Sequence, residues 1–94
     1  MRLYPDERKA LDGALQGVEG EVYLFGSRVH EDRRGGDIDL LVFSRSNAFE
    51  LSLRIAREFH VRCDERIDVL VVDPEAMTDE QEAFVATLDM VRLQ

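Results

Sequence analysis

Two aspartates, Asp37 and Asp39, stand where a buried strand is expected to begin, in the stretch "GGDIDLLVF". Successive side chains of a strand point to opposite faces, so these carboxylates share one face while Ile38 and Leu40 share the other. Neighbouring carboxylates repel each other, and apolar surroundings add a desolvation cost to each charge. A divalent cation removes both penalties, and Mg²⁺ prefers carboxylate oxygens together with water and substrate phosphates.

A third acid, Asp68, stands one residue inside the β-branched run "IDVLVV". Three carboxylates that converge can hold two metal ions about 3.5–4 Å apart, which clamp the attacking and leaving oxygens of an in-line displacement at phosphorus. Taken singly, each acid has an ordinary interpretation: Asp37 as a turn residue, Asp39 and Asp68 as solvent-facing strand positions. Taken together they favour a metal site, so all three are predicted as metal ligands.

Gly26 and Ser27 follow the apolar run "EVYLF" and supply what the acids lack. A glycine after a strand lets the backbone approach a phosphate closely, and N–H groups with a serine hydroxyl can donate to its oxygens. Gly26, Ser27 and the adjacent Arg28 are therefore the predicted nucleotide-binding residues, with a solvated loop charge as the alternative for Arg28. A solvated position is favoured over phosphate binding or proton transfer for three further loop residues: His30, Arg33 and Arg34.

The surrounding sequence predicts the elements that position these residues. Helices are expected from Pro5 to Val18, from a cap at Asn47 through residue 60, and after the capping-box residues Thr78 and Gln81 as far as Val91. Strands are expected from Glu21 to Phe25, from Asp37 to Phe43 and from Ile67 to Val72, with a brief extended piece at Val61 to Cys63 and a helical turn opening at Ser27. The stripe Phe49, Leu53, Ala56 and Phe59 is predicted to face the core. This order predicts a small sheet with helices packed on it.

Length and composition limit the possible classes of protein. The 94 residues predict a single domain spanning 1–94, and the net charge of −8 argues against a general nucleic-acid binder. No apolar run approaches the ~20 residues of a membrane span, and no secretion signal is visible, so a cytoplasmic protein is expected. The single cysteine, Cys63, is interpreted as a small buried hydrophobe.

The stretch "GSRVHEDRRGGDIDLLV", with nine residues between Ser27 and Asp37, resembles the Gly-Ser, spacer, Asp-x-Asp signature of the DNA polymerase β-like nucleotidyltransferase superfamily. The run "RIDVLVV" stands where that family carries its third acid. The resemblance is closest to the minimal nucleotidyltransferases, and it implies an α+β fold with a small mixed sheet and helices packed on one side. Many minimal members read Gly-Ser-Arg-Ala-Arg-Gly, whereas here His30 and Glu31 replace the second arginine and the glycine.

The resemblance also implies an activity. A nucleoside monophosphate would pass from a nucleoside triphosphate such as ATP to a hydroxyl, with Asp37, Asp39 and Asp68 as catalytic, Mg²⁺-binding residues and two ions expected. Minimal members often act as antitoxins of a separate helical partner of the HEPN type, some by adding AMP to a tyrosine of that toxin. Other partners expected from the family are a substrate-binding subunit or a second copy of the chain. The alternatives are a partner-binding antitoxin without catalysis and a nucleotide-sensing module.

Overall fold

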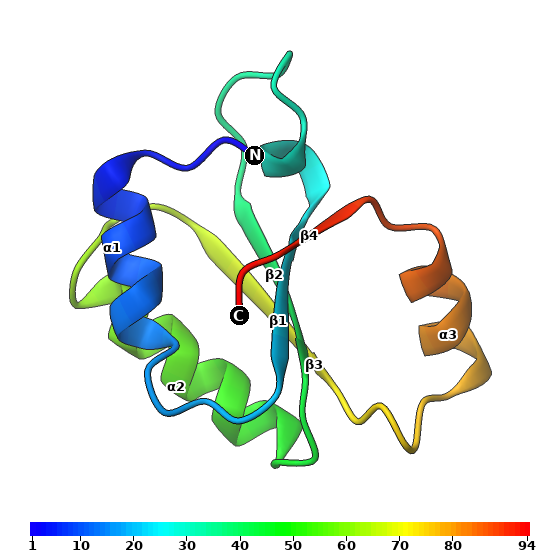
Figure 1. The fold of residues 1–94 in the computed structure, drawn as a ribbon. Helices are drawn as coiled ribbons and strands as arrows, with labels where there is room; N and C mark the ends of the chain where they lie inside the picture. The colour runs from blue at the N-terminus through cyan, green and yellow to red at the C-terminus, as the bar shows by residue number, and fades with distance from the viewer.

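A computed structural model describes residues 1–94 and shows a four-stranded sheet with two helices packed on one side (Figure 1). The elements, in chain order, are α1 (Pro5–Ala14), β1 (Glu21–Phe25), the 3₁₀ turn η1 (Gly26–Val29), β2 (Ile38–Phe43), α2 (Ala48–His60), β3 (Ile67–Val72), α3 (Asp79–Ala86) and β4 (Met90–Arg92). None of the three α-helices has the length and apolar character that crossing a bilayer demands.

The sheet is mixed, with strand order β3-β2-β1-β4. β1 is antiparallel to both β2 and β4, whereas β2 and β3 are parallel. A parallel pair needs a long crossover connection, and α2 provides it. The α+β fold with a small mixed sheet that the resemblance implied is therefore confirmed.

The core lies between the sheet and the helices α1 and α2. It is one cluster of 14 buried residues, to which the strands contribute alternate side chains such as Val22, Leu24, Ile38 and Leu40. The intervening side chains point to the other face of the sheet because strand side chains alternate. α3 lies beyond that second face (Figure 1), where Phe84 meets Phe25 of β1 edge-on with ring centroids 6.0 Å apart.

The predicted core stripe of α2 is wrong in part. Phe49 is 74% exposed and Leu53 is 37% exposed, whereas Phe59 is fully buried as predicted. The helix buries Ile55 and Phe59, both apolar positions of its expected helical pattern, together with Leu51, and the three recur at the four-residue spacing of one helix face. Both sets have helical spacing, and only the packing of α2 against α1 and β3 decides which of them faces inward.

The chain does not close with a helix, contrary to the prediction. α3 ends at Ala86, and Met90–Arg92 forms β4 on the free edge of β1, with Val91 opposite Leu24. Sheet pairing outweighs the helical spacing of these residues because it satisfies the backbone groups of β1 along that edge. Two smaller differences concern element ends: α1 stops at Ala14 instead of Val18, and the residues after His60 form a turn instead of an extended piece.

Candidate active site

Two of the predicted acids lie side by side on the second face of the sheet. Asp39 on β2 and Asp68 on β3 are direct partners in the parallel register, and Phe25 of β1 is the partner of Asp39 on its other side. Residues paired in register project to the same face, so both carboxylates point away from α1 and α2. Asp68 is exposed and Asp39 is half-buried.

Asp37 completes the group from the residue just before β2. Asp37 is half-buried, and its charge acts on Asp39. The pKa of Asp39 is raised first by burial, then by the charge of Asp68 and then by that of Asp37. Burial disfavours an ionised carboxyl, and neighbouring negative charges disfavour it further. Asp39 therefore has Asp68 beside it in register, and Asp37 lies near enough for its charge to act on the Asp39 carboxyl.

The Gly-Ser turn lies directly against these acids. Gly26 has a φ of +77°, and a Cβ added to it would overlap the Asp39 carboxylate oxygen Oδ2. Gly36, just before Asp37, has a φ of +88° and packs in the same way against the Ser27 hydroxyl oxygen. Both positions thus need glycine for the left-handed backbone and for the close approach. The predicted turn is therefore packed against Asp39, one of the three predicted acids.

Arg28 occupies a different environment from Gly26 and Ser27. It is only 2% exposed, and its guanidinium donates to both carboxylate oxygens of Glu7 and to the carbonyl oxygens of Gly36 and Arg2. The hydrogen bond from Arg28 keeps the pKa of Glu7 below its ordinary value, although burial of Glu7 acts in the opposite direction and is the largest single influence. The nucleotide contact predicted for Arg28 remains a prediction.

Sequence reasoning missed Glu7. The signal was present, since Glu7 precedes Ala10, Leu11 and Ala14 at helical spacings of three, four and seven and so falls on the apolar face of α1. An acid on a buried face needs a cationic or hydrogen-bonding partner. That partner, Arg28, is 21 residues away in the sequence and could not be named from it.

The other loop residues singled out by the sequence are exposed or partly exposed. Arg33 and Arg34 are exposed and, with Arg2 and Gly35, take part in lining a surface cavity of about 470 Å³. His30 has a side chain 39% exposed, and its Nε2 lies 3.7 Å from a carboxylate oxygen of Asp89. These positions accord with the solvated roles that were favoured for them.

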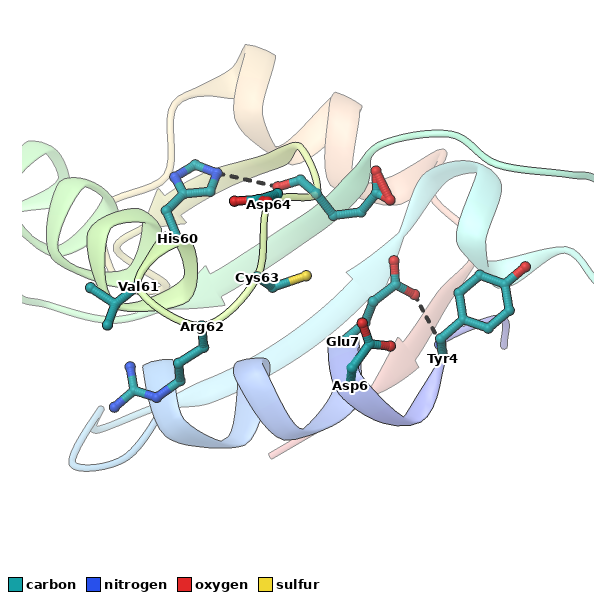
Figure 2. Close-up of a pocket in the computed structure, with 9 residues that line it drawn as sticks. Tyr4, Asp6, Glu7, His60, Val61, Arg62, Cys63 and Asp64 are labelled. Carbon is teal, nitrogen blue, oxygen red and sulfur yellow. Dashed lines mark hydrogen bonds between the residues drawn. The ribbon is translucent and has the colours of Figure 1, made fainter.

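Five surface cavities of the molecule are lined by residues other than the three acids. Figure 2 shows one of about 500 Å³ between the start of α1 and the turn after α2, with the partly buried Cys63 and Glu7 among its lining residues. These five cavities have volumes of about 420–510 Å³, and none of them is lined by Asp37, Asp39 or Asp68. Because Asp68 is exposed, this part of the second sheet face is open to solvent.

The carboxylates of Asp37, Asp39 and Asp68, in their present conformations, provide only part of the ligand set that a hard cation needs. No three acidic, histidine or cysteine side chains come together closely enough to hold a metal ion in their present conformations. Mg²⁺, however, usually binds one or two carboxylates and completes its shell with water and phosphate oxygens. The paired Asp39 and Asp68, with Asp37 beside them, match that chemistry.

The comparisons with known proteins agree with this geometry. The family model described as "Polymerase beta, Nucleotidyltransferase" matches residues 20–89, about three quarters of the chain. The matched range runs from the residue before β1 to the residue before β4 and includes Gly26, Ser27 and all three acids. A search of curated proteins gave no match. The chain belongs to the polymerase β-type nucleotidyltransferase family.

Proposed function

We propose that this protein transfers a nucleoside monophosphate, AMP from ATP, to a hydroxyl group with the help of Mg²⁺. One observation carries the proposal: Asp39 and Asp68 are paired across β2 and β3, and the Gly26–Ser27 turn packs directly against Asp39. A carboxylate pair suited to a cation thus adjoins a turn suited to phosphate. A nucleoside triphosphate bound to divalent cations is the ligand that needs both.

Each residue has a defined part in the proposed reaction. Asp37, Asp39 and Asp68 would hold Mg²⁺, which when bound neutralises the charge that develops on the phosphate oxygens. The Ser27 hydroxyl and the backbone N–H groups of the turn would donate to the triphosphate. The exposed Asp68 would accept the proton of the attacking hydroxyl. That hydroxyl oxygen bonds to the α-phosphorus while the bond from phosphorus to pyrophosphate breaks.

The acceptor is proposed to come from another chain. Asp68 is exposed, and none of the five cavities described is lined by the acids, which supports a hydroxyl presented from outside this domain. The family resemblance suggests a tyrosine of a helical HEPN-type toxin, with this protein as its cytoplasmic antitoxin. A substrate-binding subunit or a second copy of the chain would meet the same geometric need.

Intact mass spectrometry of co-purified proteins, incubated with ATP and Mg²⁺, tests the proposal. The expected result is an AMP adduct on a partner, and its position identifies the acceptor. The variant Asp37→Ala/Asp39→Ala should label the partner several orders of magnitude more slowly, because about 1.4 kcal/mol of lost transition-state stabilisation corresponds to a factor of ten. Asp32→Ala removes one acid from the exposed loop and should label like the wild type.

Two outcomes would change the conclusion. Equal labelling by the doubly substituted variant and the wild type would exclude these acids as the catalytic group. Neutralisation of the partner by that variant at a one-to-one ratio, without any adduct, would indicate a binding antitoxin that needs no catalysis.

A further inference from the structure

Arg28 is the most enclosed cation near the site, and protein groups occupy its donors. Its side chain is 3% exposed. Nη1 and Nη2 donate to the two carboxylate oxygens of Glu7 at 2.7 and 3.0 Å, Nε donates to the Gly36 carbonyl at 2.9 Å, and Nη1 also donates to the Arg2 carbonyl at 3.1 Å. A planar guanidinium suits this task because its fork binds a carboxylate at two points while a third N–H remains free for another acceptor.

These bonds connect the two ends of the loop that carries the site. Arg28 directly follows Ser27, and Gly36 directly precedes Asp37, so the Nε bond closes the loop across its base. Glu7 anchors this closure to α1, where it is itself buried. The buried ion pair thus helps to fix the relative placement of Ser27 and Asp37.

Arg2 supports the same loop from the N-terminal segment. Its guanidinium donates to the carbonyl oxygens of His30, Ser27 and Gly35 at 2.5, 2.8 and 3.1 Å. Its own carbonyl accepts from Arg28, and its N–H donates to the Arg28 carbonyl at 2.6 Å. The loop therefore has backbone support at several residues, with the Glu7–Arg28 pair as the buried part.

We propose that Arg28 is a positioning residue, which together with Glu7 fixes the Gly26–Ser27 turn relative to Asp37 and makes no contact with the nucleotide. That the Glu7–Arg28 pair fixes the loop rests on the hydrogen bonds alone. That this affects nucleotide binding rests on the proposed function. It assigns to Arg28 a role different from the nucleotide contact that its place beside Ser27 predicts. It also makes Glu7, on a helix of the opposite side of the sheet, part of the apparatus that supports the site.

The two roles differ in what the removal of Glu7 does. If Arg28 positions the loop, Glu7→Gln should weaken the binding of ATP with Mg²⁺ about as much as Arg28→Met does. If Arg28 contacts phosphate, Glu7→Gln releases the guanidinium and should leave that binding unchanged or stronger. Single substitutions leave a buried charge without its partner and can prevent folding. The paired variant Glu7→Met/Arg28→Met removes both charges at similar volume, a change that buried ion pairs often tolerate.

Amide hydrogen exchange of the metal-free protein, followed by mass spectrometry, is the first measurement. In Glu7→Met/Arg28→Met, amides between Gly26 and Asp37 should exchange at least about tenfold faster, while those of β1 and β2 keep their wild-type protection. Glu65→Gln is the matched control. Glu65 lies 3.8 Å from the same guanidinium but is half-exposed, so its removal should change neither region. Uniformly faster exchange, or no change in the loop, would overturn the proposal.

Calorimetry with ATP and Mg²⁺ is the second measurement. Glu7→Met/Arg28→Met should bind at least about tenfold more weakly than the wild type, and Glu65→Gln should bind normally. Wild-type affinity in Glu7→Gln, combined with lost affinity in Arg28→Met, would show that Arg28 is a nucleotide ligand and would overturn the proposal. Absence of binding by the wild type would count against the proposed function alone, because the exchange comparison does not depend on nucleotide.

Discussion

Gly26 determines both the backbone conformation of its turn and the space available to the Asp39 carboxylate. Its φ of +77° costs any other residue about 1–2 kcal/mol, and an added Cβ would overlap the Asp39 carboxylate. Gly26→Ala should therefore lower the free energy of unfolding by more than the backbone cost and should also displace Asp39. Mg²⁺ affinity, measured by calorimetry, should fall roughly 10- to 100-fold, as when the support of a metal ligand is disturbed.

Gly17 offers a matched control on the same scale. Its φ is +80°, but no atom lies within 4 Å of the position that a Cβ would take. Gly17→Ala should cost only the backbone term of about 1–2 kcal/mol and leave Mg²⁺ affinity unchanged. Equal Mg²⁺ affinities in the two variants would contradict the close packing of Gly26 against Asp39.

Some positions of the site residues follow from local sequence patterns, whereas others depend on contacts between segments that are far apart in the chain. Alternation within a strand predicted one face for Asp37 and Asp39, and the structure has Asp39 on β2 and Asp37 just before that strand. Asp68 was predicted inside its strand, and it lies on β3. The register that sets Asp39 beside Asp68 is a property of two strands joined through α2, and no local pattern contains it. The partner of Arg28 depends in the same way on how α1 packs, which is why the buried pair was missed.

At the scale of elements, α2 carries two phenylalanines in opposite environments. Phe59 is fully buried, whereas Phe49 is 74% exposed. Phe59→Ala should lower the free energy of unfolding by about 3–5 kcal/mol, since it leaves a cavity in the core. Phe49→Ala should change that free energy by no more than about 0.5 kcal/mol, as is usual for surface positions. Urea denaturation of both variants checks this, and a large loss in Phe49→Ala would place the core on the other stripe.

Most helices and strands were predictable from the sequence, but the last strand was not. β1, β2, β3 and α2 were predicted nearly to their observed ends, because each has a clear apolar pattern with a cap, glycine or proline beside it. The last residues were predicted as helix, since Phe84, Leu88 and Val91 recur at helical spacing. The observed β4 exists because β1 offers an unpaired edge there, and that edge is visible only once the sheet is assembled.

For the molecule as a whole, two carboxyl groups act on stability in opposite directions as pH changes. The pKa of Asp39 is raised, so its ionised form disfavours the folded state, and the metal-free protein gains stability as the pH falls through that pKa. The pKa of Glu7 is lowered below its ordinary 4.5, so its pairing with Arg28 contributes above that pH and is lost as the pH falls through the lowered pKa. The net charge of −8 adds self-repulsion at neutral pH.

These terms together predict that the metal-free protein is most stable on the acidic side of neutrality. Its free energy of unfolding, from denaturant titrations in EDTA at constant ionic strength, should rise as the pH falls from neutrality through the raised pKa of Asp39. It should fall again at pH values below the ordinary 4.5 of Glu7, where carboxylates that are paired in the folded state become protonated. Asp39→Asn should make the free energy of unfolding depend less on pH on the neutral side of its maximum, and it should raise the melting temperature at pH 7 by a few degrees. The reason is that the cost of burying the charged carboxylate and its repulsion from Asp68 and Asp37 disappear. Asp32→Asn, in the exposed loop, removes the same charge and tests whether net charge alone suffices. If Asp39→Asn and Asp32→Asn show the same dependence of unfolding free energy on pH on the neutral side of the maximum, overall charge repulsion sets that dependence. The three acids would then not interact as the fold places them.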